Sequence, residues 1–302
     1  MTVARTGVHQ VLVLGGEGQL AQALRQVTWP PGLEPVFLGH ARCDVTDREA
    51  LRSALDSLAP VAVINASAYT NVDRAEAEEE KAALTNAAGP RILAQLCQEQ
   101  HRPLIHISTD YVFDGQQDVP YTELSEPAPL SAYGRTKLAG DKAVAAETER
   151  HLIFRASWLY SERAGNFVSK ILELARTRPE LQVVADQVGS PTYALDLARA
   201  ISLVLPRCID DDADARGLFN FANAGETSWF DFARTIVASQ ADRSSGGQVS
   251  PVIKPVTAAF YGAAARRPRY SVLDCRKAAA VLGIVARDWR DSLGECLAKR
   301  ST

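Results

Sequence analysis

The chain has 302 residues, of which 46% are hydrophobic and 23% are charged, and its formal net charge is −3. This length suggests two domains or one large domain, and the composition excludes collagen-like, disordered and disulfide-scaffold proteins. The near balance of charges argues against a nucleic-acid-binding protein that works through a basic surface.

Predicted strands and helices alternate along the first half of the chain. In order they are strand 11–14, helix 19–27, strand 36–38, helix 48–58, strand 61–65, one or two helices within 75–100, strand 104–108, helix 133–147 and strand 152–155. Short apolar runs alternating with helices predict a Rossmann-type doubly wound parallel sheet. Ligands of such sheets bind outside the carboxyl ends of the strands. Residues that follow a strand are therefore the first candidates for a site.

The pattern changes after residue 156, where prolines divide the chain into shorter elements. We expect a first domain over 1–156 and a smaller mixed α/β domain over 157–302, with some segments returning to the first domain. The Asp-rich segment 210–214 and the Ser- and Gly-rich segment 244–247 are predicted to be surface loops.

No sequence feature indicates secretion, a membrane span or a metal site. The five cysteines contain no Cys-x-x-Cys pair, and the five histidines show no metal-ligand spacing. The N-terminal segment lacks the apolar run of a signal peptide, and no apolar stretch approaches the ~18 residues of a membrane span. We therefore expect a cytoplasmic protein that holds no metal and binds neither membrane nor nucleic acid.

A glycine-rich turn joins the first predicted strand to the first helix. Gly15, Gly18 and Ala21 give the pattern G-x-x-G-x-x-A. Glycine allows a tight turn and lets a pyrophosphate approach the amides of a helix N-terminus. Its place between strand and helix favours a dinucleotide site in the first domain over an ordinary turn.

The end of the second predicted strand bears on cofactor choice. An acidic residue there would bind the ribose 2′-hydroxyl of NAD, but no acid follows Leu38 directly, while Arg42 or Arg25 could face a 2′-phosphate. We therefore expect NADPH, with NADH as the alternative. Asp44 either contacts adenine or, like Thr46, caps the next helix.

A second group of polar residues suits proton transfer. Tyr133 and Lys137 are four residues apart, which on a helix places both side chains on one face. An adjacent ammonium would lower the tyrosine pKa and tune it as an acid or base. Thr109, at the end of a strand, could donate to a substrate oxygen. The alternatives are a solvated helix face and a strand-end turn.

Beyond these motifs, the chain resembles the extended short-chain dehydrogenase/reductase superfamily. Within it, the chain is similar to the dTDP-4-dehydrorhamnose reductase family. The matching segments are 15–21, 65–73, 108–115, 129–140, 155–160, 186–192 and 267–274. Two residues depart from the family pattern: Ala21 replaces a frequent glycine, and Tyr69 stands where relatives often have His.

The resemblance implies a role for each matching residue. Tyr133 would protonate the sugar O4, Lys137 would hold the nicotinamide ribose, and Thr109 would hydrogen-bond O4. The implied cofactor residues are Gly15, Gly18, Gln19, Leu20, Asp44, Val45, Ala68, Tyr69, Thr70, Tyr133 and Lys137. The implied substrate residues are Thr70, Thr109, Asp110 and Trp158. Trp158 is equally interpretable as a core residue.

The implied reaction is NADPH-dependent reduction of the C4 ketone of dTDP-4-dehydro-6-deoxy-L-mannose. One alternative is a 4-ketoreductase for another nucleotide-linked deoxysugar, and another is an epimerase or dehydratase that retains NAD. A third is a non-catalytic NADP-binding subunit resembling the regulatory subunit of methionine adenosyltransferase. The expected partner is a nucleotide-diphosphate sugar, and a homodimer is the expected assembly. The basic run 266–269 either binds a substrate diphosphate or is a solvated loop.

Overall fold

A computed structural model describes residues 7–241 and 250–300. Its main sheet has six strands in the order β10-β5-β4-β3-β1-β2, and all of its pairings are parallel. The strands are β1 (His9–Leu14), β2 (Leu33–Leu38), β3 (Ala62–Asn65), β4 (Leu104–Thr109), β5 (His151–Ala156) and β10 (Gly217–Phe221). The strand order reverses beside β1, between β2 and β3, which places the expected ligand crevice at their carboxyl ends.

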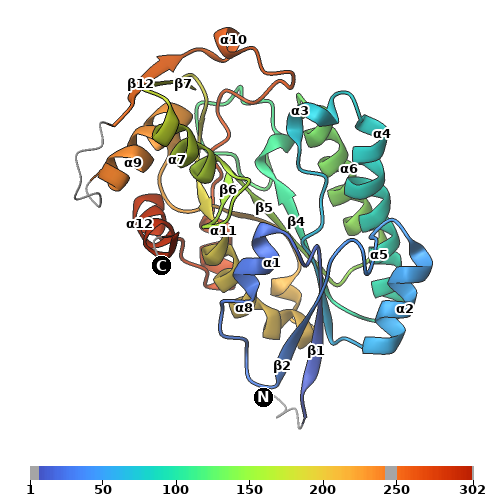
Figure 1. The fold of residues 1–302 in the computed structure, drawn as a ribbon. Helices are drawn as coiled ribbons and strands as arrows, with labels where there is room; N and C mark the ends of the chain where they lie inside the picture. The colour runs from blue at the N-terminus through green and yellow to red at the C-terminus, as the bar shows by residue number, and fades with distance from the viewer. Residues whose placement is uncertain (1–6, 242–249, 301–302) are drawn as a thin grey trace.

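Helices cover both faces of this sheet (Figure 1). Side chains of β1 alternate: Val11 and Val13 face one apolar core, and Leu12 and Leu14 face the other. The first core includes side chains of α1 (Gln19–Leu24) and α8 (Ala194–Ile209), and the second includes those of α2 (Arg48–Leu58) and α5 (Gly89–Glu99). Burial on both faces explains why the strands read as continuous apolar runs.

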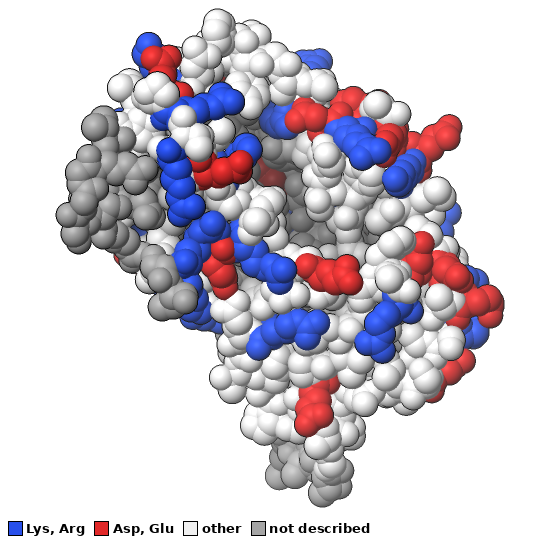
Figure 2. Space-filling view, in the orientation of Figure 1, with Lys and Arg blue, Asp and Glu red and all other residues white. Residues whose placement is uncertain are grey.

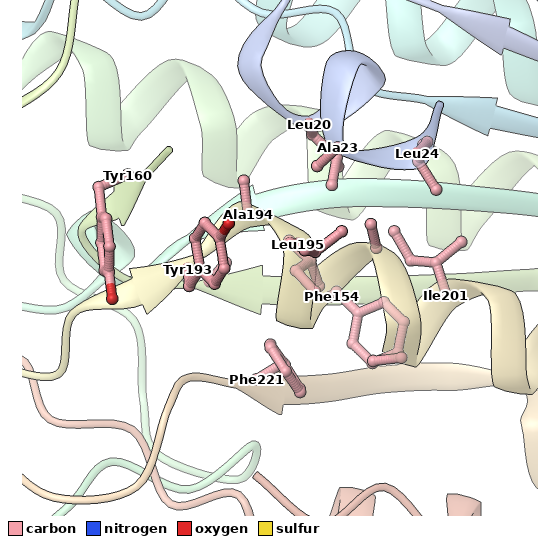
Figure 3. Close-up of a cluster of buried hydrophobic side chains, with 14 of the residues drawn as sticks. Leu20, Ala23, Leu24, Phe154, Tyr160, Tyr193, Ala194, Leu195, Ile201 and Phe221 are labelled. Carbon is pink, nitrogen blue, oxygen red and sulfur yellow. The ribbon is translucent and has the colours of Figure 1, made fainter. Parts of the chain in front are cut away.

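Figure 3 shows the centre of the first core. Leu20 and Leu24 of α1 lie over α8, and Phe154 of β5 and Phe221 of β10 lie on its other side. A helix and a strand from the second half of the chain thus complete the layer around the first helix. The glycine turn that precedes α1 is held in place by this packing.

The remaining elements are further helices between β3 and β5, and the helices and short sheets of the second half of the chain. Besides α5, the segment between β3 and β5 contains α3 (Val72–Ala75), α4 (Glu79–Ala83), a π-helix (Leu84–Ala88) and α6 (Ala132–Glu147). Later helices are α7 (Phe167–Thr177), α9 (Trp229–Ala241), α10 (Ala258–Tyr261), α11 (Arg276–Leu282) and α12 (Trp289–Arg300). Three two-stranded sheets pair β6 (Leu159–Tyr160) with β9 (Thr192–Tyr193), β7 (Glu180–Val184) with β12 (Val252–Val256), and β8 (Val188–Gly189) with β11 (Thr227–Ser228).

The five predicted strands and the doubly wound parallel sheet are confirmed, while several helix boundaries differ. Helix 19–27 ends at Leu24, whose carbonyl accepts a hydrogen bond from the indole of Trp29 at 2.9 Å. Residues 75–100 form α4, the π-helix and α5 rather than one or two helices. Asp47, not Asp44 or Thr46, caps α2, because its carboxylate accepts from the amides of Glu49 and Ala50.

Of the two predicted surface loops, one lies within the described residues. Segment 210–214 includes the start of a short 3-10 helix (Ala213–Ala215), and the side chains of Asp210 and Asp211 are exposed. Segment 244–247 lies outside the described residues. Across 7–241 and 250–300, no helix has the length and apolar character needed to cross a membrane.

Candidate active site

The glycine turn is shaped by close backbone contacts. Gly15 has a φ of +75°, and a Cβ there would lie 2.7 Å from the backbone of Ala66 and Ser67, just beyond β3. The Gly16 amide donates to the Leu38 carbonyl at the end of β2, and the Gly18 amide donates to Gly15. The turn is therefore held tightly against the residues that follow β2 and β3, at the start of α1, where the amides of a helix N-terminus can meet a pyrophosphate.

The side chains of the next two residues, Gln19 and Leu20, make contacts within the protein. Gln19 accepts through Oε1 from Ser161 Oγ and Asn166 Nδ2, each at 2.9 Å. Leu20 is 4% exposed and belongs to the first core. Their predicted cofactor contacts are thus possible through the amides at the start of α1.

The loop after β3 is positioned by the buried side-chain amide of Asn86. Ala68 and Tyr69 are half-buried and Thr70 is exposed. Asn86, which is 0% exposed, accepts from the Tyr69 amide at 2.8 Å and donates to its carbonyl at 3.1 Å. Asn86 lies in the π-helix, where an extra residue in the turn redirects a side chain. Sequence reasoning missed this residue, because a π-helix has no simple sequence signature.

The Tyr69 side chain is engaged by neighbouring residues of the protein. Its hydroxyl donates to Glu78 at 2.9 Å, and its ring packs on the small apolar cluster of Ala75, Ala82 and Ala132. Tyr133 packs against the same cluster. A histidine-sized side chain at position 69 would not reach Glu78 in the same way, so this departure from the family pattern is accommodated by a local partner.

Asp44 and Val45 occupy the loop between β2 and α2. Asp44 accepts from the amide and hydroxyl of Thr46, both at 2.9 Å. Although burial acts to raise its pKa, the hydrogen bonds from Thr46 and the neighbouring His40 hold the pKa of Asp44 below its ordinary value. Val45 is buried in the second core and contacts Gly89. Asp44 therefore remains free to face an adenosine, while Val45 anchors the loop.

Thr109 and Asp110 follow β4 directly. The Thr109 hydroxyl accepts from the Tyr111 amide and donates to Asp110 Oδ1, both at 3.2 Å. Asp110 is 1% exposed, and its other carboxylate oxygen has no hydrogen-bond partner. Burial raises the pKa of Asp110 to about 7, against the hydrogen bonds from Ser271 and Thr109. An unpartnered buried carboxyl oxygen is a group that a polar ligand would satisfy.

Tyr133 is positioned by the first turn of α6. Ser131 caps this helix by accepting from the Gly134 amide at 3.1 Å. Gly134 lies so close to the carbonyl oxygen of Tyr111 that no Cβ fits between them. This contact joins α6 to the segment after β4 and brings the Tyr133 hydroxyl close enough to Thr109 to influence the tyrosine pKa. The sequence separates the two residues widely, and the fold brings them together.

The expectation that Lys137 lowers the pKa of Tyr133 is wrong. Burial raises the pKa of Tyr133 to about 12, and the nearby Thr109 hydroxyl only partly offsets this. The carboxylates of Asp110 and Asp141 act in the same direction as burial, because both disfavour a phenolate. Tyr133 is therefore a protonated phenol at neutral pH.

Lys137 lies one turn further along α6 and is 1% exposed. Its Nζ donates to the Ile107 carbonyl at 2.6 Å and lies 3.4 Å from Nε2 of His106. Burial lowers the pKa of Lys137 to about 8, and the charge of Asp141 opposes this shift. The lysine thus lies at the interface of α6 and β4, behind Tyr133.

Trp158 follows β5 in a strained conformation. Its φ of +47° is rare for a residue with a Cβ. Its ring is half-buried and stacks on Trp229 with centroids 3.4 Å apart and planes within 7°. Trp158 is therefore neither a free platform nor a core residue: part of it is packed and part remains accessible. Trp229 was missed by sequence reasoning because it lies in a segment with no recognised motif.

The C-terminal segment reaches back to the residues after β4. Arg267 pairs with Asp73 at 2.8 Å and also bonds the Tyr111 hydroxyl. Ser271 donates to Asp110. Arg269 pairs with Asp118 on the surface. The run 266–269 is thus neither a simple solvated loop nor a row of free diphosphate ligands, because two of its arginines are engaged by carboxylates.

The chain matches the family model described as RmlD substrate binding domain over residues 9–302. The chain belongs to this family. It is 40% identical over 284 residues to a dTDP-4-dehydrorhamnose reductase of Sinorhizobium fredii, covering 94% of this chain and 95% of that protein. It is also 37% identical over 285 residues to a probable dTDP-4,6-dihydroxy-2-methyloxan-3-one 4-ketoreductase of Streptomyces antibioticus, covering 94% and 93% of the two chains.

A solved member of the family has a closely similar fold. The crystal structure of dTDP-4-dehydrorhamnose reductase from Bacillus anthracis in complex with NADP matches with a TM-score of 0.87 at 32% identity. The match covers 97% of this chain and 99% of that one. The family assignment therefore rests on nearly the whole chain, and includes both the sheet and the later segments.

Proposed function

We propose that the protein reduces the C4 ketone of dTDP-4-dehydro-6-deoxy-L-mannose to dTDP-L-rhamnose with NADPH. The observation that carries the proposal is the convergence of Thr109, Tyr133 and Lys137 at the carboxyl edge of the sheet. The glycine turn at Gly15, in the same sheet, supports a dinucleotide there. The names of the relatives supply the substrate class.

Each residue of the site has its own role in the reduction of the ketone. Bound nicotinamide supplies the hydride. Tyr133, kept as a phenol by burial, donates its proton to the developing oxyanion at O4. The Thr109 hydroxyl donates to Asp110 in the structure, and its rotation would turn the same proton toward O4 and fix the position of that oxygen. Lys137 holds a ribose hydroxyl through Nζ, and Asp110 accepts from a sugar hydroxyl through its unpartnered oxygen.

The surface is consistent with an anionic substrate bound by local groups. Figure 2 shows a hollow in the face above α1, with Lys and Arg as well as Asp and Glu around its rim. The formal net charge of the chain is −3. Attraction of the diphosphate must therefore come from individual cations and helix amides rather than from the whole molecule.

The direct test is incubation of the protein with NADPH and enzymatically prepared dTDP-4-dehydro-6-deoxy-L-mannose. We expect NADPH oxidation and a product whose NMR spectrum is that of dTDP-L-rhamnose. A folded protein that leaves this sugar unreduced would rule out the proposal.

The second candidate is a 4-ketoreductase for another nucleotide-linked deoxysugar. It is favoured by the similarity to the Streptomyces antibioticus protein, whose name describes such an activity. The same site chemistry would serve both substrates, because the sugar ring is recognised by residues outside the proton-transfer group. Comparison of kcat/KM for the two 4-keto sugar nucleotides distinguishes the candidates.

We also propose that 1–156 binds the cofactor and transfers the proton, and that 157–302 sets most of the sugar specificity. Trp158 and Trp229 support this division, since both belong to the second part of the chain. We expect the protein to form a homodimer, which sedimentation velocity would test. We expect its location to be the cytoplasm.

Replacing Trp229 by Ala is expected to raise KM for the sugar nucleotide by about 2- to 10-fold. The reason is that the stacked pair holds the strained Trp158 in place, and such pairs contribute about 0.5–1.5 kcal/mol beyond burial. Steady-state kinetics at saturating NADPH measures the effect. Trp229→Phe is the matched control and should keep most of the affinity. An unchanged KM in folded Trp229→Ala would show that the stack has no role in substrate binding.

Cofactor preference is expected to depend on two opposite charges near the end of β2. The Glu17 carboxylate lies against Gly39, where a Cβ would be 2.7 Å from its oxygen, and Arg42 is exposed two residues before Asp44. The acid that the sequence lacks after β2 is thus supplied from the glycine turn. Arg25 instead lies over the Phe37 ring, 3.8 Å from its centroid.

Arg42→Ala should lower kcat/KM for NADPH about 10-fold and leave that for NADH nearly unchanged, because an exposed arginine paired with a phosphate contributes on the order of 1–2 kcal/mol. Glu17→Gln should act in the opposite direction, since it removes a charge that repels a 2′-phosphate. Kinetics with both cofactors tests the pair of variants, and equal effects on NADPH and NADH would contradict the prediction.

A further inference from the structure

Two buried hydrogen-bonding side chains, Asn65 and His106, form a row that ends on Lys137. Neither of the two has a part in the chemistry described above. Asn65 ends β3 and His106 lies on the adjacent strand β4, and both side chains are 0% exposed. His106 lies between Asn65 and Lys137, with one ring nitrogen facing each. The direction of every hydrogen bond in this row can be worked out from one end.

The backbone fixes the orientation of the Asn65 amide. The Ser67 amide donates to Asn65 Oδ1 at 3.1 Å, and the Ser67 hydroxyl donates to the same oxygen at 2.6 Å. A backbone N–H can only donate, so the atom opposite it must be the amide oxygen. Asn65 Nδ2 then faces His106 Nδ1 at 3.2 Å and must donate to it.

This contact selects the tautomer of His106. A ring nitrogen that accepts carries no proton, so the proton of a neutral imidazole is on Nε2. Burial lowers the pKa of His106 well below its ordinary value, which agrees with a neutral ring. The Nε2–H group points toward Lys137, whose Nζ is 3.4 Å away.

An ammonium at Lys137 would place a donor opposite a donor. An uncharged amine removes the mismatch, because its lone pair accepts from His106 Nε2–H while it donates to the Ile107 carbonyl at 2.6 Å. We propose that Asn65 locks His106 in the Nε2–H tautomer, and that this tautomer makes His106 a positioning residue which favours the amine form of Lys137 before the cofactor binds. The functional meaning of this inference rests on the proposed role of Lys137 in the reductase.

Other charged groups around Lys137 act in both directions. Asp141, one turn along α6, favours the ammonium, but its Oδ2 is occupied by Ser108 at 2.8 Å and Arg155 of β5 at 3.3 Å. Its Oδ1 lies 4.0 Å from His106 Nε2 and has no hydrogen-bond partner. Tyr133 and Asp110 are neutral or titrating groups nearby on the ligand side. The His106 contact is therefore the direct polar neighbour that opposes the charge.

A lysine held near its titration can change charge within a catalytic cycle. When Tyr133 gives up its proton, the nascent phenolate favours an ammonium at Lys137. Before that moment, burial and the donor that faces Lys137 both act against the ammonium, so the amine is accessible near neutral pH. The row from Ser67 to Lys137 thus makes the charge of Lys137 sensitive to events at Tyr133 and at the loop after β3.

The test uses the cofactor-free protein, labelled with ¹⁵N at histidine and lysine. The ¹⁵N shifts of His106, assigned through His106→Gln, are expected to show an unprotonated Nδ1 and a protonated Nε2. The Lys137 Nζ resonance, assigned through Lys137→Arg, is followed through a pH titration. A protonated Nδ1 on a neutral ring would overturn the inference.

Two variants change the row in different ways. In Asn65→Asp a carboxylate accepts from Nδ1–H, so the tautomer should switch and the Lys137 midpoint should rise by about one pH unit or more. In His106→Gln the side-chain oxygen can accept from the ammonium, which should raise the midpoint without adding charge. A switched tautomer with an unchanged midpoint, or an unchanged midpoint in folded His106→Gln, would overturn the proposal.

The pH profile of kcat provides the functional readout, and its limb assigned to Lys137 should move with the NMR midpoint in both variants. Thermal unfolding checks that each variant is folded, and if Asn65→Asp does not fold, His106→Gln decides. Because the NMR experiments need neither sugar nor NADPH, a failure of the proposed substrate assignment would leave their outcome intact and would be recognised separately.

Discussion

Tyr133→Phe is expected to lower kcat by roughly 10²–10⁴-fold, the usual contribution of general acid catalysis. The variant keeps the ring that packs on Ala75 and Ala132 but loses the phenol hydroxyl beside Thr109. No other group has been assigned the role of proton donor to O4, so the loss should appear directly in kcat. Stopped-flow and steady-state measurements of NADPH oxidation with the 4-keto sugar nucleotide test this prediction.

Tyr111→Phe is the matched control for the loss of a neighbouring hydroxyl. Its ring meets that of Tyr133 edge-on at 5.9 Å, and its hydroxyl bonds Arg267. We expect a small effect on kcat, because this hydroxyl contacts a structural cation rather than the reacting oxygen. NADP affinity should stay within a few-fold in both variants. A Tyr133→Phe variant with an unreduced rate would refute the proton-donor assignment.

Arg155→Met is expected to have the largest effect on stability, about 3–5 kcal/mol. Arg155 and Asp141 form an ion pair at 3.3 Å, and their side chains are 4% and 5% exposed. Methionine keeps much of the apolar volume but leaves the Asp141 carboxylate without its cation. Removal of one partner of a buried pair costs far more than the pair itself contributes. Urea unfolding at fixed pH measures the difference.

The stability lost in Arg155→Met should depend on pH in a defined direction. Burial holds the pKa of Asp141 above its ordinary value even with Arg155 present, and the variant should raise it further. A carboxyl group with a raised native pKa contributes stability at acidic pH and loses it as pH rises. The destabilisation should therefore be small near pH 4 and grow toward pH 8. A pH-independent loss would indicate that the cost comes from packing rather than from charge.

The double variant Arg155→Met/Asp141→Leu separates these two causes. If the uncompensated carboxylate is responsible, the second substitution should restore most of the lost stability, since apolar replacements of buried pairs are often neutral or stabilising. Asp141→Leu alone leaves Arg155 unpaired and should be as harmful as Arg155→Met. Additive losses in the double variant would contradict an ion-pair origin.

Five of the six strands of the main sheet were predictable because each is a short apolar run between helix-like segments. The sixth strand, β10, was missed, because it comes from the second half of the chain, where no alternation of strands and helices was recognised. The same reasoning failed at helix ends, which depend on individual contacts. α1 ends at Leu24, whose carbonyl accepts from the Trp29 indole, and Asp47 rather than Asp44 caps α2. The π-helix at Leu84–Ala88 was invisible to periodicity, because its residues suit an α-helix equally well.

The candidate site was predictable where it follows strand ends, as Gly15 and Thr109 do. Sequence reasoning could also place Tyr133 and Lys137 on one helix face. It could not find Asn86 or Trp229, because their positions depend on how distant segments pack. It misjudged the pKa of Tyr133 as well, since burial is a property of the whole fold and not of the i, i+4 spacing.

The contacts of Arg267 and Ser271 have a consequence for the design of chimeras. These residues belong to the second half of the chain, yet they hold Tyr111 and Asp110, which belong to the first. An exchange of the second half between relatives, made to change the sugar, would also replace the supports of the proton-transfer segment. Altered turnover in such a chimera would then reflect a disturbed acid site as much as a new sugar pocket. Transplants that retain 265–274 should keep the two effects apart.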